Sequence, residues 1–340
     1  MSSEREPGPA EIAAAIARLP VEIEGHAVET GPVDVPGYYD GRPRPKGVAI
    51  LRGGGEDGRG ECVAWTPEAQ ADFAAALPGL VPVGATTVGE VSERLRAAKA
   101  YHRAAVEAAA IDLALRQSST NIFVQSRRPA RPVAFCRSLT AARDPLPEVR
   151  GILARDPAAR FKLDPPEDGW DDPTWDALAD LGRVVVVDFK RKGDATAVAR
   201  AHAALPGAWL EDPPREALDD PLPAWAGRVA LDGWVERAAD LEWPVLPPAA
   251  VNVKAARVGG PLEALRVLEV CARHGWHAYF GGMFEVDAGR DQARVLASLF
   301  TPGAWNDLAP LDDGSTSSPL PAPSDFIGFA PRETGSGAPT

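Results

Sequence analysis

The sequence predicts an α/β protein in which a modified (β/α)8 barrel over residues 131–311 follows a smaller α+β domain over residues 1–130. Short β-rich runs recur in the second part of the chain, and each ends in a charged residue that precedes a helical stretch. The charged residues that end consecutive runs are 21 to 31 residues apart, which is the length of one βα unit. Doubly wound nucleotide-binding folds are disfavoured, because neither GxGxxG nor GxxxxGKS/T occurs at a strand-to-helix turn.

The first part of the chain begins with extended structure and ends with helices. Residues 21–64 have a β-rich pattern, in which a strand over 47–52 turns at a glycine-rich hairpin and returns over 60–63. Apolar residues at spacings of three and four predict a helix over 94–116. This order indicates a small β-meander followed by helices.

Seven runs in the second part are typical of parallel barrel strands. They cover residues 132–139, 160–164, 183–190, 208–212, 228–232, 250–255 and 277–285. An eighth unit, which a closed barrel needs, is not resolved by periodicity. The tail is rich in Pro, Ser and Gly. Part of 312–332 is expected to pack against the first domain, and residues 333–340 are expected to be disordered.

The composition excludes several classes of function. The 48 acidic residues outnumber the 36 basic ones, giving a formal charge of −12, so a nucleic-acid partner is not expected. No apolar run is long enough to cross a membrane, and the acidic N-terminus has no leader pattern. The three cysteines and five histidines show no disulfide or metal-binding spacing, so a cytoplasmic protein is expected. Only six of the basic residues are lysines, which singles out any lysine at a strand end.

Charged residues at the carboxyl ends of barrel strands converge on one mouth, where barrel enzymes place their chemistry. Asp188, Glu211 and Asp232 end successive runs and predict a site for Mg²⁺, or for Mn²⁺, because hard cations prefer carboxylate oxygens. Lys162 lies in the run before them and Lys254 in the run after them, as candidate catalytic residues for proton transfer beside a metal-bound carboxylate. Each residue alone is more typical of a solvated loop than of a catalytic site. Five of them in register favour a functional site.

Several motifs resemble those of the enolase superfamily, in particular its branch of muconate cycloisomerases and o-succinylbenzoate synthases. The matching segments are Gly58-Arg59-Gly60-Glu61, residues 104–113, residues 209–213, Val251-Asn252-Val253-Lys254, Arg257-Val258-Gly259-Gly260 and Gly281-Gly282-Met283-Phe284-Glu285. Together they cover most of the chain.

The resemblance implies that the first domain is an enolase-type capping domain and that the three acids bind Mg²⁺. It implies that Lys254 faces the substrate and that Gly282, Met283 and Glu285 contribute to substrate binding. The implied enzyme is a lyase or isomerase that abstracts a proton α to the carboxylate of a small substrate. Dehydration, cycloisomerisation or racemisation/epimerisation would follow.

Three strand ends depart from the family pattern. The second strand of the family carries Lys-x-Lys, but the second lysine is Asp164 here. The third strand usually reads Asp-Ala-Asn but here has Lys190 two residues after Asp188, and the fifth reads Asp232-Gly233-Trp234 in place of Asp-Glu-Ser. Since residues i and i+2 share a face of a strand, Asp164 and Lys190 are expected to point into the mouth from neighbouring strands.

Two interpretations of these departures are open. In the first, the catalytic lysine has moved one strand over to Lys190, with Asp164 as its ion-pair partner. In the second, the ammonium group of Lys190 takes the position of the Mg²⁺ and stays charged beside the carboxylates, which makes it a poor base. The protein would then be a catalytically altered or inactive homologue that binds a small molecule.

Substrate specificity is expected to come from a loop of the capping domain over residues 33–46. Its candidate substrate-binding residues are Tyr38 and Arg42, and an arginine here, including Arg44, can pair with a second substrate carboxylate or simply be solvated. Trp170 and Trp234 lie beyond strand ends and either wall the pocket or pack under outer helices. The expected partner is a small carboxylate, with no nucleic acid and no membrane, and a homo-oligomer is compatible with the sequence.

Overall fold

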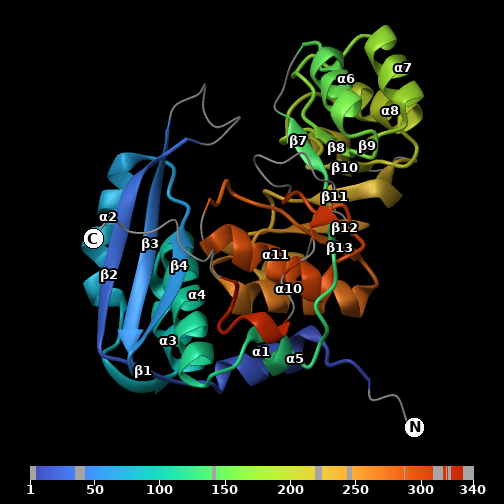
Figure 1. The fold of residues 1–340 in the computed structure, drawn as a ribbon. Coiled ribbons are helices and arrows are strands. Elements are labelled where there is room, and N and C mark those ends of the chain that lie inside the picture. The colour runs from blue at the N-terminus through green and yellow to red at the C-terminus, as the bar shows by residue number, and fades with distance from the viewer. Residues whose placement is uncertain are drawn as a thin grey trace.

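The computed structural model describes residues 5–34, 43–139, 143–218, 224–242, 247–286, 288–308, 317–318, 320 and 323–331. Tyr38, Arg42 and the tail 333–340 lie outside these residues. A small α+β domain stands beside a ring of parallel strands and helices (Figure 1). The fold class predicted from the sequence is therefore confirmed, whereas the domain boundaries given above stay predictions.

The capping domain is built on a three-stranded antiparallel sheet of β2 (Gly25–Val33), β3 (Arg44–Gly53) and β4 (Glu56–Cys62). The β3–β4 hairpin turns at Gly54 and Gly55, whose φ angles of 58° and 76° suit glycine and a two-residue turn of matching twist.

The sheet packs closely on helix α4 (Ala100–Gln117) because β4 carries glycine where the two elements meet. A Cβ on Gly60 would lie 2.0 Å from the carbonyl oxygen of Ala105, and a Cβ on Gly58 would lie 2.2 Å from that of Ala109. The Gly-x-Gly motif noted in the sequence is thus required by this approach of sheet to helix.

The helices of the capping domain include one that is shorter than the sequence predicted. Helices α2 (Pro67–Leu80) and α3 (Val88–Arg94) begin at Thr66 and Thr87, whose side chains accept backbone N–H groups. The expected helix over 94–116 is wrong at its start, because a 3-10 turn at Leu95–Ala97 and extended backbone at Ala98 precede α4. The local residues favour helix, so packing decides the break: Leu95 is fully buried in the core.

Short elements join the two domains. Helix α1 (Pro9–Ala17) packs on a barrel helix, and β1 (Pro20–Ile23) pairs antiparallel with β5 (Gly84–Thr87). Helix α5 (Ile122–Ser126) follows α4 and contacts the C-terminal segment, where the N–H of Ile122 donates to the carbonyl of Gly328.

In the described part of the barrel, seven parallel strands follow one another in sequence order around the sheet. They are β7 (Arg137–Leu139), β8 (Phe161–Leu163), β9 (Val184–Asp188), β10 (Trp209–Glu211), β11 (Val229–Leu231), β12 (Ala250–Val253) and β13 (His277–Phe280). Each strand falls inside one of the runs predicted from the sequence. Before them, β6 (Val133–Ala134) pairs with β14 (Ser317–Ser318).

Two of the described residues, Asn306 and Asp307, fill the eighth position of the ring. Asn306 bridges Phe135 on one side, and Asp307 bridges Gly281 on the other, both in the parallel sense. The Asn306 side chain fixes this position: its amide oxygen accepts the N–H of Phe280 at 2.8 Å, and its amide nitrogen donates to the carbonyl of Ala134 at 3.1 Å. This is the unit that periodicity could not find.

Most strands lead into a helix that covers the outside of the ring. These helices are α6 (Leu146–Arg155), α7 (Asp172–Leu181), α8 (Ala195–Ala204), α10 (Pro261–His274) and α11 (Ala288–Phe300). The short helix α9 (Ala255–Val258) joins β12 to α10 and packs against α4. In the described residues that follow β10 and β11 there are only 3-10 turns, over Arg215–Leu218, Ala226–Arg228 and Ala238–Leu241. The expectation of a helical stretch after every strand is wrong there, because both connections are proline-rich and proline removes a helical N–H donor.

The capping domain is tied to the barrel at the loop that follows β12. Glu107 of α4 is fully buried and accepts the N–H of Leu262 at 2.8 Å, at the start of α10. Arg103 donates to the carbonyl of Gly259 at 2.5 Å. A Cβ on Gly260, whose φ is 137°, would lie 2.3 Å from the Glu107 carboxylate, so the Gly-Gly pair is required by this joint.

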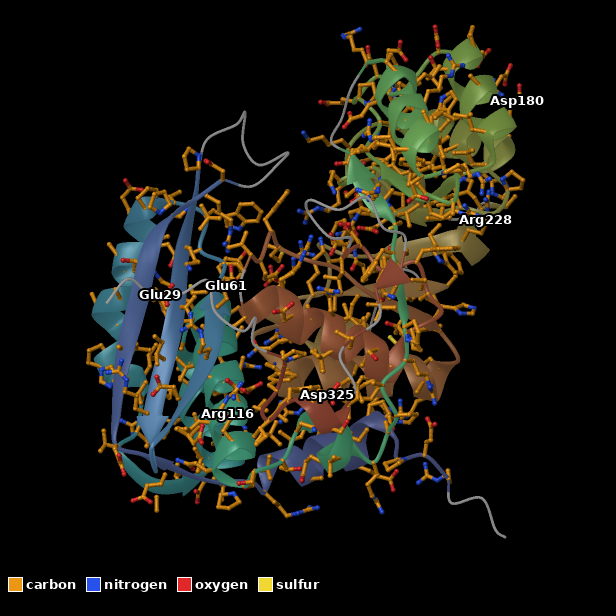
Figure 2. All side chains as sticks on the ribbon, in the orientation of Figure 1. Glu29, Glu61, Arg116, Asp180, Arg228 and Asp325 are labelled. Carbon is orange, nitrogen blue, oxygen red and sulfur yellow. The ribbon has the colours of Figure 1, made fainter. Side chains whose placement is uncertain are left out.

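A second joint involves the carboxylate at the end of β4. Figure 2 shows Glu61 on the side of the capping sheet that faces the barrel, and Glu61 accepts the N–H of Val286 at 3.1 Å. Glu61 also forms a buried ion pair with Arg44 at 2.7 Å. Near the C-terminus, Phe329 is buried and its N–H donates to Asp112 of α4 at 2.8 Å, so this residue packs on the capping domain.

Candidate active site

Three buried carboxylates meet at the carboxyl ends of neighbouring barrel strands. Asp188 is the last residue of β9, Glu211 is the last residue of β10, and Asp232 directly follows β11. One oxygen from each lies within 4.8 Å of the others. These three residues, called the carboxylate triad below, are the three acids that the sequence predicted as metal ligands.

Lys162 of β8 lies against two members of the triad. Its Nζ is 2.5 Å from Glu211 Oε1 and 2.8 Å from Asp188 Oδ2, and the side chain is 1% exposed. Asp307, in the eighth position of the ring, is 3.3 Å away. Burial alone would lower the pKa of Lys162, but the surrounding carboxylates, Asp188 first, outweigh it and raise the pKa well above its ordinary value. Lys162 is therefore held as a cation.

Asp164 and Lys190 form the pair that the sequence predicted across β8 and β9. Lys190 Nζ contacts Asp188 Oδ2 and is 3.5 Å from Asp164 Oδ2. Burial raises the pKa of Asp164 to about 6, and the charge of Lys190 offsets part of that shift. The other oxygen of Asp164 is buried and has no hydrogen-bond partner in the described part of the chain. The carboxylates of Asp188 and Asp164 overcome burial and raise the pKa of Lys190, so it too is a cation.

Lys254 approaches the triad from the opposite side of the ring. It directly follows β12, which is four positions round the ring from β8, and its Nζ is 2.9 Å from Asp232 Oδ2. The guanidinium of Arg257 contacts the other oxygen of Asp232. Although burial opposes it, these two cations hold the pKa of Asp232 below its usual range.

The structure adds polar residues that the sequence analysis did not single out. Asn252 Nδ2 donates to Glu211 Oε1 at 3.2 Å, and the Tyr279 hydroxyl donates to Glu211 Oε2. Asn252 lies two residues before Lys254 and so shares its face of β12, a signal the sequence did contain. Asp307 could not be predicted from the sequence, because the residues around it have no strand pattern.

The residues of the last barrel motif divide between two places. Met283 Sδ is 3.6 Å from the Arg257 guanidinium, which brings it beside the triad. The N–H of Gly282 donates to the carbonyl of Asp307 at 3.0 Å. Glu285 turns back to accept the N–H of Met283 at 2.7 Å. The substrate-binding roles of these three residues stay predictions.

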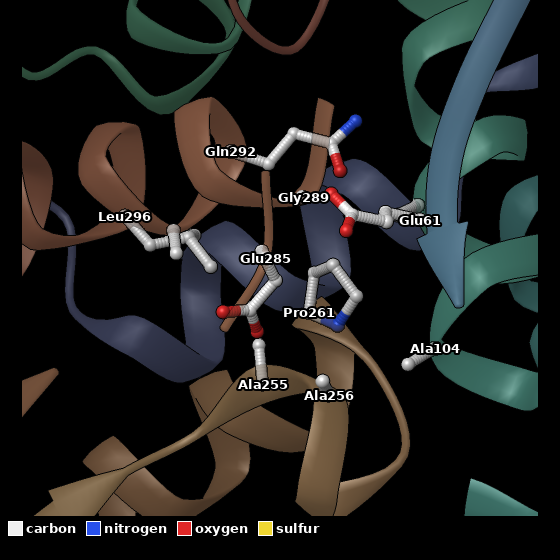
Figure 3. Close-up of a pocket in the computed structure, with 11 residues that line it drawn as sticks. Glu61, Ala104, Ala255, Ala256, Pro261, Glu285, Gly289, Gln292 and Leu296 are labelled. Carbon is white, nitrogen blue, oxygen red and sulfur yellow. The ribbon is translucent and has the colours of Figure 1, made fainter. Parts of the chain in front are cut away.

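Glu285 borders a small cavity between the two domains (Figure 3). The cavity, about 30 Å³, lies between Glu61 and Ala104 of the capping domain and Ala255, Glu285 and Gln292 of the barrel. This volume accommodates about two water molecules, which is too little for a substrate.

The packing of three further candidates shows where each of them lies. Arg44 is not the predicted receptor for a substrate carboxylate, because it is buried and paired with Glu61. Trp170 packs under the outer helices, edge-on to Trp175 at 4.8 Å between ring centroids. Trp234 instead lies beneath the guanidinium of Arg191 at the rim of the mouth.

The donor set fits a divalent cation. Six carboxylates converge on the mouth: Asp164, Asp188, Glu211, Asp212, Asp232 and Asp307. Among the described residues, ion pairs join members of this set to Lys162, Lys190, Lys254 and Arg257. Burial and then the neighbouring Asp188 raise the pKa of Glu211 well above its ordinary value, as expected where negative charge exceeds positive charge. Hard oxygen ligands with an excess of negative charge suit a hard divalent ion.

Comparisons with known proteins agree with this geometry. The family models described as "Domain of unknown function (DUF8230) N-terminal domain" and "Domain of unknown function (DUF8230) C-terminal domain" match residues 14–124 and 129–312. The chain is 30% identical to an N-succinylamino acid racemase of Amycolatopsis sp over 241 residues. That match covers 66% of this chain and 64% of the racemase, so the chain spans less than two thirds of this relative.

Solved structures match over almost the whole chain. An unknown member of the enolase superfamily from Enterococcus faecalis V583 superposes with a TM-score of 0.71 at 21% identity, over 85% of this chain and 86% of that one. The muconate lactonizing enzyme from Pseudomonas putida superposes with a TM-score of 0.71 at 18% identity, over 91% of this chain and 96% of that one. The resemblance inferred from the motifs is confirmed at the level of the fold. No helix in the described part of the chain combines the length and hydropathy of a membrane span.

Proposed function

The chain belongs to the family described as domain of unknown function DUF8230 and has the fold of the enolase superfamily, and on this basis we propose that it abstracts a proton α to the carboxylate of a small acid. The carboxylate triad would hold a divalent cation, Mg²⁺ or Mn²⁺. Racemisation or epimerisation, cycloisomerisation and dehydration all begin with this step. The enzyme would accordingly be an isomerase or a lyase.

One observation carries the proposal. Lys162 on β8 and Lys254 after β12 come from opposite sides of the ring, and the carboxylate triad lies on the three strands between them. A substrate carboxylate bound at the triad would place its α-carbon between the two sides. That arrangement suits removal of a proton on one face with positive charge on the other.

We assign proton transfer to Lys254. Lys254 and Arg257 contact different oxygens of Asp232, so Asp232 keeps a permanent cation beside it when Lys254 is neutral. The carboxylate neighbours of Lys162 hold it protonated, which makes it a poor base. It would attract the substrate carboxylate and the charge that develops as the proton leaves. When bound, a divalent cation supplies further stabilisation of that charge.

The direct test is exchange of the α-proton with solvent. The name of the curated relative suggests N-succinyl amino acids as trial substrates, incubated with the protein and Mg²⁺ in D₂O and followed by ¹H NMR. Lys254→Met should slow exchange by at least about 10²-fold, the lower range for loss of a general base. Lys192→Met removes an exposed lysine near the same mouth and should leave exchange unchanged. Equal exchange in wild type and Lys254→Met would contradict the assignment.

A second candidate function is favoured by a specific observation. The six oxygens of the carboxylate triad all accept hydrogen bonds from this chain: Lys162, Lys190, Lys254, Arg257, Asn252, Tyr279 and the N–H of Lys190 are the donors. Such a site is compatible with a metal-free protein that binds a small acid without turnover. Binding of a substrate acid by calorimetry in EDTA, without α-proton exchange when Mg²⁺ is added, would support this function over the first.

A further inference from the structure

Two of the strand ends that depart from the family pattern meet at the rim of the mouth. Arg191 follows β9 and Trp234 follows β11, and the guanidinium carbon of Arg191 lies 5.4 Å from the centre of the Trp234 ring. The loop after β10 passes between them, where the N–H of Arg191 donates to the carbonyl of Asp212 at 2.8 Å. The segments that follow β9 and β11 thus share one contact.

The backbone holds Arg191 in an unusual position. Lys190 and Arg191 have φ angles of 52° and 64°, two consecutive non-glycine residues in the left-handed region. The turn is fixed by the N–H of Lys190, which donates to Asp188 Oδ1 at 2.9 Å, and by the N–H of Lys192, which donates to the carbonyl of Phe189 at 2.8 Å. Strained backbone that its surroundings hold in place is found mostly at functional sites.

Gly233 provides the space for this arrangement. A Cβ at residue 233 would lie 2.9 Å from the Asp212 carboxylate and 3.4 Å from the Arg191 guanidinium carbon. A larger side chain would move the guanidinium, and a glutamate would also neutralise it. Asp212 does not take that role, because its two oxygens accept the N–H groups of Asp232 and Gly233 at 2.8 and 2.7 Å.

Two side chains at this rim, Arg191 and Trp234, carry N–H donors for which no acceptor is described. In the described part of the chain Arg191 forms no ion pair, and it is exposed to solvent. The indole N–H of Trp234 is buried and has no acceptor among the described residues. One face of the guanidinium lies on the indole, so its N–H edge remains to bind a planar anion such as a carboxylate.

We propose that Arg191, held on Trp234, is the receptor for a second carboxylate of the substrate, whose first carboxylate binds at the triad. This inference rests on the proposed function, because it places the reacting end of the same molecule at the triad. The substrate class is a dicarboxylic acid. Of the two capping-loop arginines, Arg44 is committed to Glu61, and Arg42 lies outside the described residues, so its predicted role stays a prediction.

The test compares two acids that differ only at the remote end. N-succinylglycine carries a second carboxylate, whereas N-butyrylglycine has a methyl group in that place, and both are titrated calorimetrically into the full-length protein with Mg²⁺. Wild type should bind the dicarboxylate about tenfold more tightly or better, as one charge-assisted contact allows. Arg191→Met should remove this preference and leave the affinity for N-butyrylglycine unchanged.

Two further variants make the result specific. Lys192→Met removes the neighbouring exposed cation and should preserve the preference, which separates a local contact from general electrostatic attraction. Trp234→Phe keeps a ring under the guanidinium and should lose only part of the preference. A wild-type protein that binds both acids equally, or an Arg191→Met variant that keeps the preference, overturns the inference while the α-proton exchange test still stands. Failure of wild type to bind either acid would overturn the proposed function and this site together.

Discussion

Replacement of Lys162 by methionine tests the electrostatics of the site most informatively. The substitution keeps the length of the side chain but removes the charge that lies 2.5 Å from Glu211 and 2.8 Å from Asp188. All three side chains are at most 1% exposed, so solvent does not screen the loss. Removal of one partner from a buried ion pair typically costs about 3–5 kcal/mol of unfolding free energy. We expect a loss in this range for Lys162→Met in metal-free buffer.

The assay is urea denaturation followed by circular dichroism, in EDTA and in Mg²⁺. Lys99→Met is the matched control, because Lys99 also forms an ion pair, with Asp72 at 2.6 Å, but is 71% exposed. Its loss should leave the denaturation midpoint essentially unchanged. If the carboxylate triad binds a divalent ion, Mg²⁺ should restore part of the stability of Lys162→Met. A variant as stable as wild type in EDTA would refute the account of a buried, paired ammonium group.

Three further predictions concern other parts of the molecule. Lys190→Ala should leave α-proton exchange measurable, because the raised pKa of Lys190 makes it a cation and not a base; a loss as complete as that of Lys254→Met would support the relocated catalytic lysine instead. Burial lowers the pKa of His102 below 6.5, so the unfolded chain binds a proton that the folded chain does not. The stability that this provides is present above about pH 6.5 and is lost as pH falls through the folded pKa, and His102→Gln should flatten the dependence of urea midpoint on pH between 5 and 7. Gly60→Ala should cost at least about 1–3 kcal/mol in the same denaturation assay, because its Cβ would overlap α4, whereas Gly79→Ala, with open space around it, should be neutral or stabilising.

The sequence predicted the parts of the site that repeat with the strands. Asp188, Glu211 and Asp232 end successive βα units, so their convergence followed from the parallel topology alone. The pairing of Asp164 with Lys190 followed from the alternation of side chains on neighbouring strands. These features depend on local pattern, which a single sequence carries.

Other features depend on packing between distant segments. Asp307 reaches Lys162 from a position of only two bridging residues, which have no strand pattern of their own. The helix break before α4 runs against local helix propensity, and Arg191 meets Trp234 only because the turn at Lys190 and the space at Gly233 allow it. Such contacts arise from the packing of segments that are distant in the sequence, so the local sequence pattern does not predict them.

The central claim is that the carboxylate triad holds a divalent cation. Calorimetric titration of the metal-free protein with Mg²⁺ tests it directly, with Glu211→Gln as the matched variant. Since burial and Asp188 favour the protonated form of Glu211, a neutral side chain at this position is compatible with the fold. The account predicts saturable heat in wild type and a binding affinity at least about tenfold weaker in Glu211→Gln. No heat at millimolar Mg²⁺, or equal binding by the two proteins, would contradict it.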